Sequence, residues 1–442
     1  MSIERTPLEH GNRELRYDFL RGMALLVVLV DHIEDQSFLK AIRPWMPVST
    51  CYFDGAEAFV FLSGLVFGRA FQRHLQQRGL LACQQKAVRR AISIYLTYLV
   101  MALIVIGMGV CFRNYSSRLV ERLSLTEGAV QCVRWTLPMC YQPWGFPILA
   151  VYAVILPFMP LLLCWRLRSA KTAWIIPLGL YVATQMIPNL QLPRFPWGRE
   201  WIFNPFAWQF LFFIGMSVGT TRIFGKIKEM PDQTDADRGA AFWTSQVPNQ
   251  LIPRDRDLAK TWQSGETARE PDCRRSPSLT RAFFWGSLAI LVAGLLIRNN
   301  LIGAIPGAAD FQKTLVHFSN EWSHKTRIQP IRIIHFMSLV IVLSAVLPAA
   351  SAKIWHSRLL APVIKCGQNS LAVYSFGLFL TFLSIVVFRL IGESLSTILM
   401  IEFDCCVLSV GLAYLLDWYR RTRQNLTEKS TQKFQSMVSQ YQ

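Results

Sequence analysis

Residues 16–33 read RYDFLRGMALLVVLVDHI, an apolar run with ionisable side chains at both ends. The apolar core from Met23 to Val30 resembles the hydrophobic part of a signal peptide. However, Asp31 and His32 follow it where a signal peptide has small residues for cleavage. A helix that crosses a bilayer needs roughly 20 mostly apolar residues. We therefore interpret this stretch as a retained transmembrane helix.

Nine further stretches approach or reach the same length. The ten predicted spans cover residues 17–36, 54–72, 91–112, 144–165, 172–187, 205–221, 283–298, 330–349, 369–391 and 397–417. The 442-residue chain is 52% apolar and only 17% charged, whereas soluble domains have roughly 25% charged residues. This excludes a disordered protein, a disulfide-stapled secreted scaffold and an ordinary cytosolic enzyme. The sequence predicts an all-α polytopic membrane protein with about ten transmembrane helices.

The formal net charge of +18 is explained by the distribution of Lys and Arg between the two sides of a membrane. With the N-terminus placed in the cytoplasm, the inside segments hold 32 basic residues and the outside segments hold 12. Cytoplasmic loops of membrane proteins carry such an excess. Both termini are therefore predicted to be cytoplasmic, and the positive charge does not indicate a nucleic-acid partner.

The predicted spans divide the chain into five parts. They are a cytoplasmic N-terminal tail (1–16), a transmembrane core of helices 1–6 (17–221), a cytoplasmic loop (222–282), a transmembrane core of helices 7–10 (283–417) and a cytoplasmic C-terminal tail (418–442). The loop mixes 11 basic with 9 acidic residues and five Pro, which is typical of a flexible linker.

The sequence has no Walker motif, no GxGxxG, no GxSxG and no metal-ligand spacing among its ten Cys. The cysteines are expected to pack as small apolar residues, although Cys132 and Cys140 could pair in an oxidising compartment. We therefore expect the chemistry to come from the membrane helices and their short loops, without a bound metal or a tightly bound cofactor.

Ionisable groups at membrane depth cost free energy, and the first span holds the densest set of them. Arg21 and His32 are eleven residues apart, about three helical turns, so both project from one face with about 16 Å between them along the axis. Asp18 lies one turn before Arg21. An Arg21 that snorkels to headgroups and a His32 that bonds a neighbouring helix would be a purely structural explanation. A proton-transfer group or a ligand site explains the position of His32 at least as well.

Two later spans add polar candidates. Glu57 lies about one turn below the outer surface, at a depth comparable to that of His32, where a carboxylate could orient the imidazole or bind a hydroxyl-bearing substrate. His335 begins the eighth span from the outer side. Gly64 and Gly68 are spaced for a close helix contact rather than for a site, and Asn369 is interpreted as a helix N-cap.

Arg21-x10-His32 looks like the signature of the membrane-bound acyltransferase-3 superfamily, and further blocks resemble the OpgC family within it. The blocks are DGAEAFVFLSGLVFGRAF (54–71), NPFAWQFLFFIGMSVG (204–219), IRIIHFMSLVIVLSAVLP (331–348) and APVIKCGQNSLAVYSFGLFLTFLS (361–384). They lie in the same order over most of residues 15–420. Two features depart from the family pattern: the loop at 222–281 is longer and more charged, and Asn369 stands where members often carry His.

The resemblance implies a multi-pass protein of the bacterial inner membrane that succinylates osmoregulated periplasmic glucans. Succinyl-CoA, or another acyl-CoA, would be the co-substrate on the cytoplasmic side, and a sugar hydroxyl of a periplasmic glycan would be the acceptor. Arg21 and His32 correspond to the essential pair of the superfamily, and Asp31, Glu57 and His335 are carried over with them.

The physical chemistry of the expected reaction agrees with these assignments. CoA carries several phosphate charges and cannot cross a bilayer, so cytoplasmic cations such as Arg21, Arg89 and Arg90 are predicted to hold the donor, with Asp18 as a further member of the donor-binding group. His32, with Asp31 and Glu57 as further catalytic candidates, would deprotonate the acceptor hydroxyl or accept the acyl group covalently. His335 is a candidate on the acceptor side.

Other classes of membrane protein remain as alternatives to an acyltransferase. A polytopic transporter or flippase for a glycan or an acyl intermediate would also bury Arg, His and Glu among its helices. However, the sequence lacks the repeat symmetry and the paired broken helices that carriers usually show. A non-enzymatic membrane component would leave the Arg21 and His32 face unexplained.

The charge distribution leads to a topological prediction. A single reporter or cysteine label at Ser245, in the long loop, is expected to report the cytoplasmic side, because cytoplasmic segments carry the excess of basic residues. A label at Lys313, in a predicted outside segment, serves as the opposite control. An outside signal at Ser245 would reverse the orientation and, with it, the side on which the donor binds.

Overall fold

The computed structural model describes residues 14–39, 42–221 and 277–440, and within these ranges it contains helices and no strand. The first nine helices are α1 (Leu15–Gln36), α2 (Pro47–Thr50), α3 (Gly55–Cys111), α4 (Ser117–Arg122), α5 (Ala129–Thr136), α6 (Pro147–Ile155), α7 (Met159–Arg168), α8 (Ile175–Met186) and α9 (Pro205–Thr220). The later ones are α12 (Pro277–Arg298), α13 (Ala309–Glu321), α14 (Pro330–Val346), α15 (Ala361–Gln368), α16 (Ser370–Ile391) and α17 (Leu395–Gln440). The chain is therefore helical, as its apolar pattern predicts.

Five helical stretches are long and apolar enough to cross a membrane by length and composition. They are Gly55–Cys111, Pro147–Arg168, Arg281–Arg298, Ser370–Ile391 and Leu395–Thr427. The helix α1 is not among them, because charged side chains at both of its ends interrupt the apolar run. These helices fit a membrane protein. The count of ten spans and the cytoplasmic side of the termini stay predictions.

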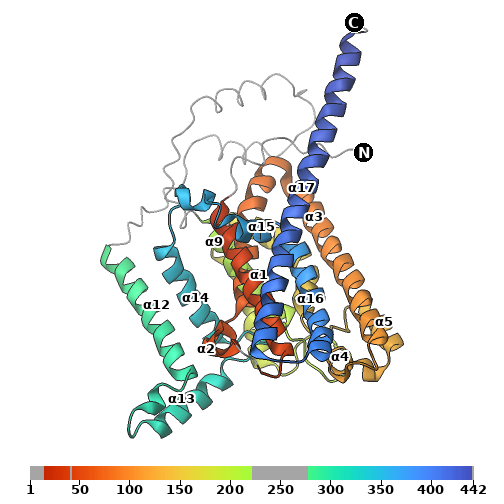
Figure 1. Ribbon diagram of the computed structural model, residues 1–442. Coiled ribbons are helices and arrows are strands. Elements are labelled where there is room, and N and C mark those ends of the chain that lie inside the picture. The colour runs from red at the N-terminus through yellow and green to blue at the C-terminus, as the bar shows by residue number, and fades with distance from the viewer. Residues whose placement is uncertain (1–13, 40–41, 222–276, 441–442) are drawn as a thin grey trace.

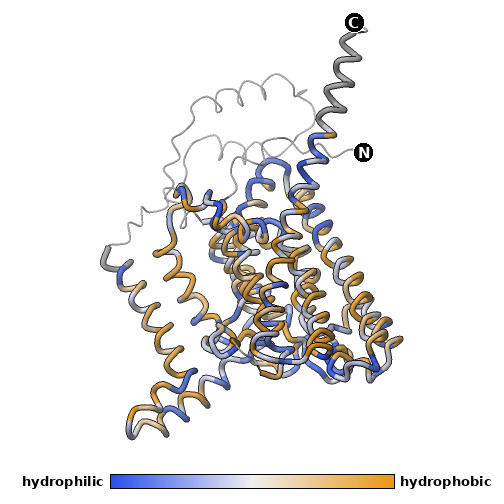
Figure 2. The backbone as a smooth tube through the Cα atoms, in the orientation of Figure 1, coloured by the Kyte–Doolittle hydropathy of each residue, from blue (hydrophilic) through white to orange (hydrophobic). Residues whose placement is uncertain are grey.

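The helices run roughly alongside one another, with apolar residues along their middle parts and hydrophilic residues towards both ends of the bundle (Figures 1 and 2). The start of α1 and the C-terminal part of α17 lie at the same end (Figure 1). The predicted tail at 418–442 begins inside α17, which continues to Gln440. The seventh helix of the prediction begins earlier than expected, at Pro277, and residues 222–276 of the predicted loop lie outside the described residues.

The helix α3 contains both the second and the third predicted spans. Gly79 has a φ of 77°, which is non-helical, and it separates two helical halves. The chain reverses there, because the Cys83 thiol lies only 3.8 Å from the carbonyl oxygen of Phe71, twelve residues earlier. In a straight helix these residues would be about 18 Å apart. Gly is suited to this position because it lacks the Cβ that disfavours a positive φ.

The first half of α3 packs tightly against α9. A Cβ placed on Gly64 would lie 2.1 Å from the carbonyl oxygen of Phe212, and one placed on Gly215 would lie 2.1 Å from that of Phe61. Gly68 makes a similar approach to Met216. The predicted close contact at Gly64 and Gly68 is confirmed, and small residues are what allow two membrane helices to touch through their backbones.

The helix α1 lies in the middle of the bundle, in contact with α3, α15, α16 and α17 (Figure 1). Its contact with α15 also depends on glycine: a Cβ on Gly22 would lie 1.9 Å from the carbonyl oxygen of Val363, and one on Gly367 would lie 1.8 Å from that of Asp18. The side chain of Asp18 is buried at this contact. Because α1 is surrounded by protein, its polar residues are not exposed to lipid on every side.

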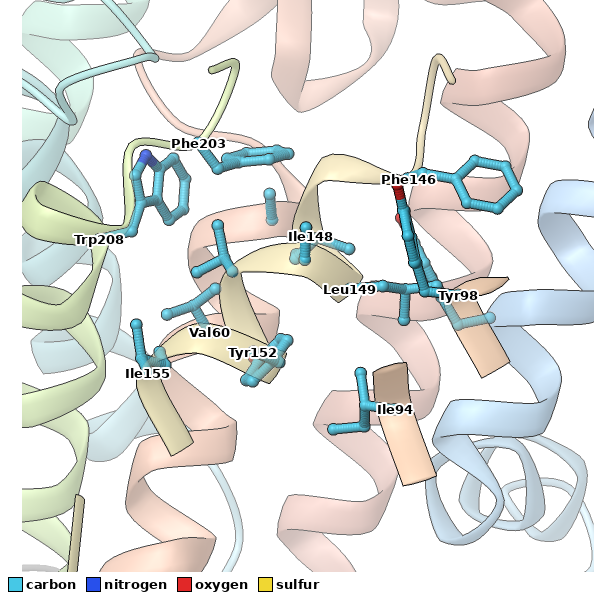
Figure 3. Packing of buried hydrophobic residues seen from close by; sticks show 14 of the residues in the cluster. Val60, Ile94, Tyr98, Phe146, Ile148, Leu149, Tyr152, Ile155, Phe203 and Trp208 are labelled. Atoms are coloured by element: carbon cyan, nitrogen blue, oxygen red, sulfur yellow. The ribbon is translucent and has the colours of Figure 1, made fainter. Parts of the chain in front are cut away.

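The short helix α6 fills the space between α9 and the second half of α3 (Figure 3). Its side chains Ile148, Leu149 and Tyr152 are almost completely buried among those of Tyr98 and Trp208. The Tyr152 hydroxyl donates a hydrogen bond to the carbonyl oxygen of Phe59 at 3.2 Å. This packing fixes the loop that precedes α6, residues 140–146, close to α1.

Two smaller predictions can be compared with the structure. Asn369 occupies the N-cap position of α16 but does not cap it, because its amide donates to the carbonyl oxygens of Lys365 at 3.0 Å and Ala413 at 3.3 Å. It thus joins α15 to α17. Cys132 and Cys140 are both buried, and neither forms a disulfide.

The α3–α9 contact leads to a stability prediction. Gly64→Ala is expected to lower the free energy of unfolding by about 1–3 kcal/mol or more, because the added methyl group overlaps the backbone of α9. Gly107→Ala in the same helix is the matched control, since nothing lies within 4 Å of a Cβ there. Thermal unfolding of the detergent-solubilised protein measures both, and equal midpoints for the two variants would contradict this account of the contact.

Candidate active site

Two of the cavities beside α1 each contain one member of the predicted pair. The first, of about 360 Å³, is lined by His32 and is called the His32 cavity. The second, of about 510 Å³, is lined by Arg21 and is called the Arg21 cavity. The spacing of Arg21 and His32 along one helix thus places them in two separate spaces.

The imidazole of His32 is held by an aromatic contact. Its ring centroid lies 4.4 Å from that of Trp144, at an interplanar angle of 61°. Gly145, with a φ of 84°, lies against the same ring, since a Cβ built there would be 3.5 Å from Cε1 of His32. No hydrogen bond to the ring nitrogens is formed by the part of the chain that the structure describes. A ligand in the cavity therefore has access to an imidazole with hydrogen-bonding capacity to spare.

A buried ion cluster forms one wall of the His32 cavity. The Asp54 carboxylate accepts hydrogen bonds from Lys325 Nζ at 2.6 Å and from Arg332 Nη2 at 3.3 Å, and it caps α3 through Ala56 N at 2.8 Å. The positive charges of Lys325 and Arg332 thus lie directly against the carboxylate of Asp54. The cluster is therefore ionised and largely neutralised from within.

Glu57 belongs to this ion cluster and does not contact His32. It is completely buried, accepts from Arg332 Nε at 2.6 Å, and accepts from the backbone N–H of Asp54 at 2.9 Å in a capping box. Asp31, by contrast, lines the His32 cavity, and its buried Oδ1 has no hydrogen-bond partner among the described residues. The structure thus brings Asp31 and His32 to the same cavity. Glu57 does not line this cavity and contacts Arg332, which does.

His335 belongs to α14, and its ring packs against α12 and lines neither of the two cavities. Its Nδ1 accepts from Tyr52 N at 3.4 Å, and its Nε2 lies 3.4 Å from the carbonyl oxygen of Leu291. Its ring also fills the space left by Gly294, where a Cβ would lie 2.2 Å from Nε2. In this structure His335 joins two helices and does not face the His32 cavity.

The Arg21 cavity gathers positive charge. It is lined by Arg21, Lys86, Arg89 and Arg90, and no acidic side chain is among the described residues that line it. The Arg21 guanidinium donates to Ser370 Oγ at 2.7 Å. The reversal at Gly79 is what brings the three cations of the second half of α3 to the start of α1. Asp18 does not line this cavity.

Some residues of the site are visible in the sequence and others are not. Lys86 stands three and four residues before Arg89 and Arg90 on one helix, so this spacing could have added it to the predicted donor-binding group. Trp144, Lys325 and Tyr374 reach the cavities from segments far away in the chain. Nothing in their local sequence indicates that position.

Comparison with known proteins gives one match. A family model described as OpgC protein matches residues 13–247 and 259–421 of the chain. No curated protein and no solved structure matches.

The ion cluster leads to a second stability prediction. Glu57→Gln is expected to lower the free energy of unfolding by up to about 3–5 kcal/mol, because it removes one carboxylate from the buried Arg332. Glu127→Gln, on an exposed side chain, is the control and should leave stability unchanged. Thermal unfolding of Glu57→Gln, Arg332→Gln and the double variant should show a loss for the pair smaller than the sum of the two. Additive losses would mean that the two residues do not act together.

Proposed function

Because the chain belongs to the OpgC family, we propose that it is a membrane O-acyltransferase that moves a succinyl or other short acyl group from cytoplasmic acyl-CoA to hydroxyls of a periplasmic glucan. Membership of this family suggests a glucan-modifying acyltransferase, and the helices fit a membrane protein. The acyl group, the donor, the acceptor and the bacterial inner membrane as the location are parts of the proposal.

The observation that carries the proposal is the charge of the Arg21 cavity. Arg21, Lys86, Arg89 and Arg90 line this cavity together, and the described residues that line it include no carboxylate, so the cavity suits a ligand with several negative charges. The phosphates of CoA are such a ligand, and guanidinium groups bind phosphate oxygens in pairs. Arg21, Arg89 and Arg90 hold the donor in this proposal, with Lys86 added by the structure. Asp18 supports α1 from outside the cavity.

In the proposed reaction, the His32 cavity provides the general base for the acceptor hydroxyl. His32 takes the proton of a sugar hydroxyl as the oxygen attacks the thioester carbonyl carbon. The new C–O bond forms, the C–S bond breaks, and the proton passes from the imidazolium to the departing CoA thiolate. In a covalent variant of this route, the imidazole first takes the acyl group and then passes it to the hydroxyl, with the same overall balance.

The other charged residues of the His32 cavity suit a polyhydroxylated acceptor. Asp31 and the ion cluster around Asp54 offer hydrogen-bond acceptors and donors to sugar hydroxyls within one cavity. Glu57 holds Arg332 in place, and His335 holds α12 against α14, so both act on the site only through other residues. No tightly bound cofactor takes part in the proposed reaction.

The role of His32 leads to the central functional prediction. His32→Ala is expected to lower acyl transfer by roughly 10²–10⁴-fold, the usual contribution of a general acid–base group, while acyl-CoA binding stays near wild type. Transfer of a radiolabelled acyl group from acyl-CoA to glucan in proteoliposomes measures this. His317→Ala, an exposed histidine on α13, is the matched control. Near wild-type transfer by His32→Ala would remove His32 from the mechanism.

Arg21 gives a separate prediction about the donor. Arg21→Lys is expected to raise the KM for acyl-CoA, because an ammonium group cannot reproduce the paired hydrogen bonds of a guanidinium to phosphate.

Mass spectrometry of periplasmic glucans from cells with and without the gene identifies the acyl group. Glucan that crosses the membrane unmodified, with no acylated product, would support a flippase instead.

A further inference from the structure

The Arg21 cavity and the His32 cavity meet at two side chains. Phe59 of α3 and Tyr374 of α16 line both cavities, and no other described residue does so. Their rings are stacked, with centroids 6.1 Å apart and planes inclined by 19°. The two cavities are therefore neighbours that are separated by one pair of aromatic rings.

We propose that the Phe59–Tyr374 pair is a partition that opens to let the acyl group pass from the Arg21 cavity to the His32 cavity. This inference rests on the proposed acyltransferase function, because it concerns how the donor bound at Arg21 reaches the imidazole of His32. Phe59 and Tyr374 are positioning residues in it. They control the path of the thioester and carry out no proton transfer.

The chemistry of the donor requires such a path. The phosphates of acyl-CoA and its thioester stand at opposite ends of a long, thin and uncharged pantetheine arm. Arg21 and His32 are about 16 Å apart along α1. An arm that passes between the two rings brings the thioester to His32 while the phosphates remain among the cations.

Each ring contacts a key residue of one cavity: Phe59 contacts Arg21, and Tyr374 is hydrogen-bonded to the residue beside His32. The Phe59 ring lies 5.9 Å from the guanidinium carbon of Arg21 and packs edge-on against Tyr152, with centroids 5.7 Å apart. The hydroxyl of Tyr374 donates to the carbonyl oxygen of Gly145, the residue that lies against His32. Phosphate that binds Arg21 competes with its contact to Phe59. A movement of Tyr374 would release the loop that holds the imidazole of His32.

The closed partition also protects the donor. The His32 cavity contains an imidazole that can activate water as a general base, whereas the thioester of a bound donor waits on the other side of the rings. Exclusion of water from a reactive intermediate prevents its hydrolysis. A partition that opens only for transfer therefore keeps acyl-CoA from being lost to water.

The first experiment measures this protection. Phe59→Ala and Tyr374→Ala are expected to bind acyl-CoA within about twofold of wild type and to hydrolyse it, without acceptor, roughly tenfold faster or more. Tyr374→Phe keeps the ring and removes only the hydrogen bond to Gly145, so hydrolysis should stay near wild type while transfer falls. Phe376→Ala, two residues after Tyr374 on α16 and outside both cavities, is the matched control and should leave hydrolysis and transfer unchanged. An unchanged ratio of hydrolysis to transfer in both ring deletions, in variants that insert and bind donor, would overturn the proposal.

A second experiment does not depend on catalysis. Ser63 lines the Arg21 cavity and not the His32 cavity, so Ser63→Cys in a chain without its ten native cysteines reports on access to that cavity. A membrane-impermeant maleimide should label this cysteine from one face only, and from both faces once Phe59→Ala or Tyr374→Ala is added. Labelling from both faces with the aromatic pair intact would overturn the partition. If the labelling changes with Phe59 and Tyr374 as expected but the protein transfers no acyl group, the proposed function is refuted and the partition stands.

Discussion

The helix α1 must be surrounded by protein, because its ionisable side chains cannot face hydrocarbon without a large cost in free energy. Its neighbours meet this requirement in a specific way. Gly22 and Gly367 let α15 touch the α1 backbone near Asp18, and Ser370 of α16 accepts a hydrogen bond from Arg21. The helices are thus arranged around one polar helix, and the two cavities are the spaces left beside its two charged ends.

The two cavities differ in how their charge is balanced. In the wall of the His32 cavity, the cations Lys325 and Arg332 are matched by the carboxylate of Asp54 and by that of Glu57 behind it. In the Arg21 cavity, the described lining residues include four cations and no carboxylate. A buried ion pair mainly fixes geometry, whereas a cavity lined by several cations attracts an anion. The wall of the His32 cavity is therefore fixed by ion pairs, whereas the Arg21 cavity suits an anionic ligand.

The apolar pattern of the sequence was enough to predict an all-helical chain, but the short helices α4, α5 and α13 lie outside the predicted spans. Helical spacing predicted that Arg21 and His32 share one face of α1. The Gly64 and Gly68 spacing also predicted a backbone contact between helices. Neighbours across the bundle were not predictable in the same way. The length of an apolar run predicts a span but not which span lies beside it. Arg332, the partner of Glu57, is 275 residues away in the chain, and no local sequence signal indicates that the two side chains meet. The same limit hid Trp144 and Tyr374, which reach the site from other helices and loops.

The ion pair between Arg332 and Glu57 also bears on how the protein responds to its surroundings. The side chains of these two residues are 10% and 0% exposed, respectively, and dissolved ions screen buried charges far less than exposed ones. An exposed pair such as Lys313 and Asp310 weakens as the salt concentration rises. The wall of the His32 cavity should therefore keep its shape when the salt concentration around the protein changes. The geometry of this site is in this way independent of whether the surrounding medium is dilute or concentrated.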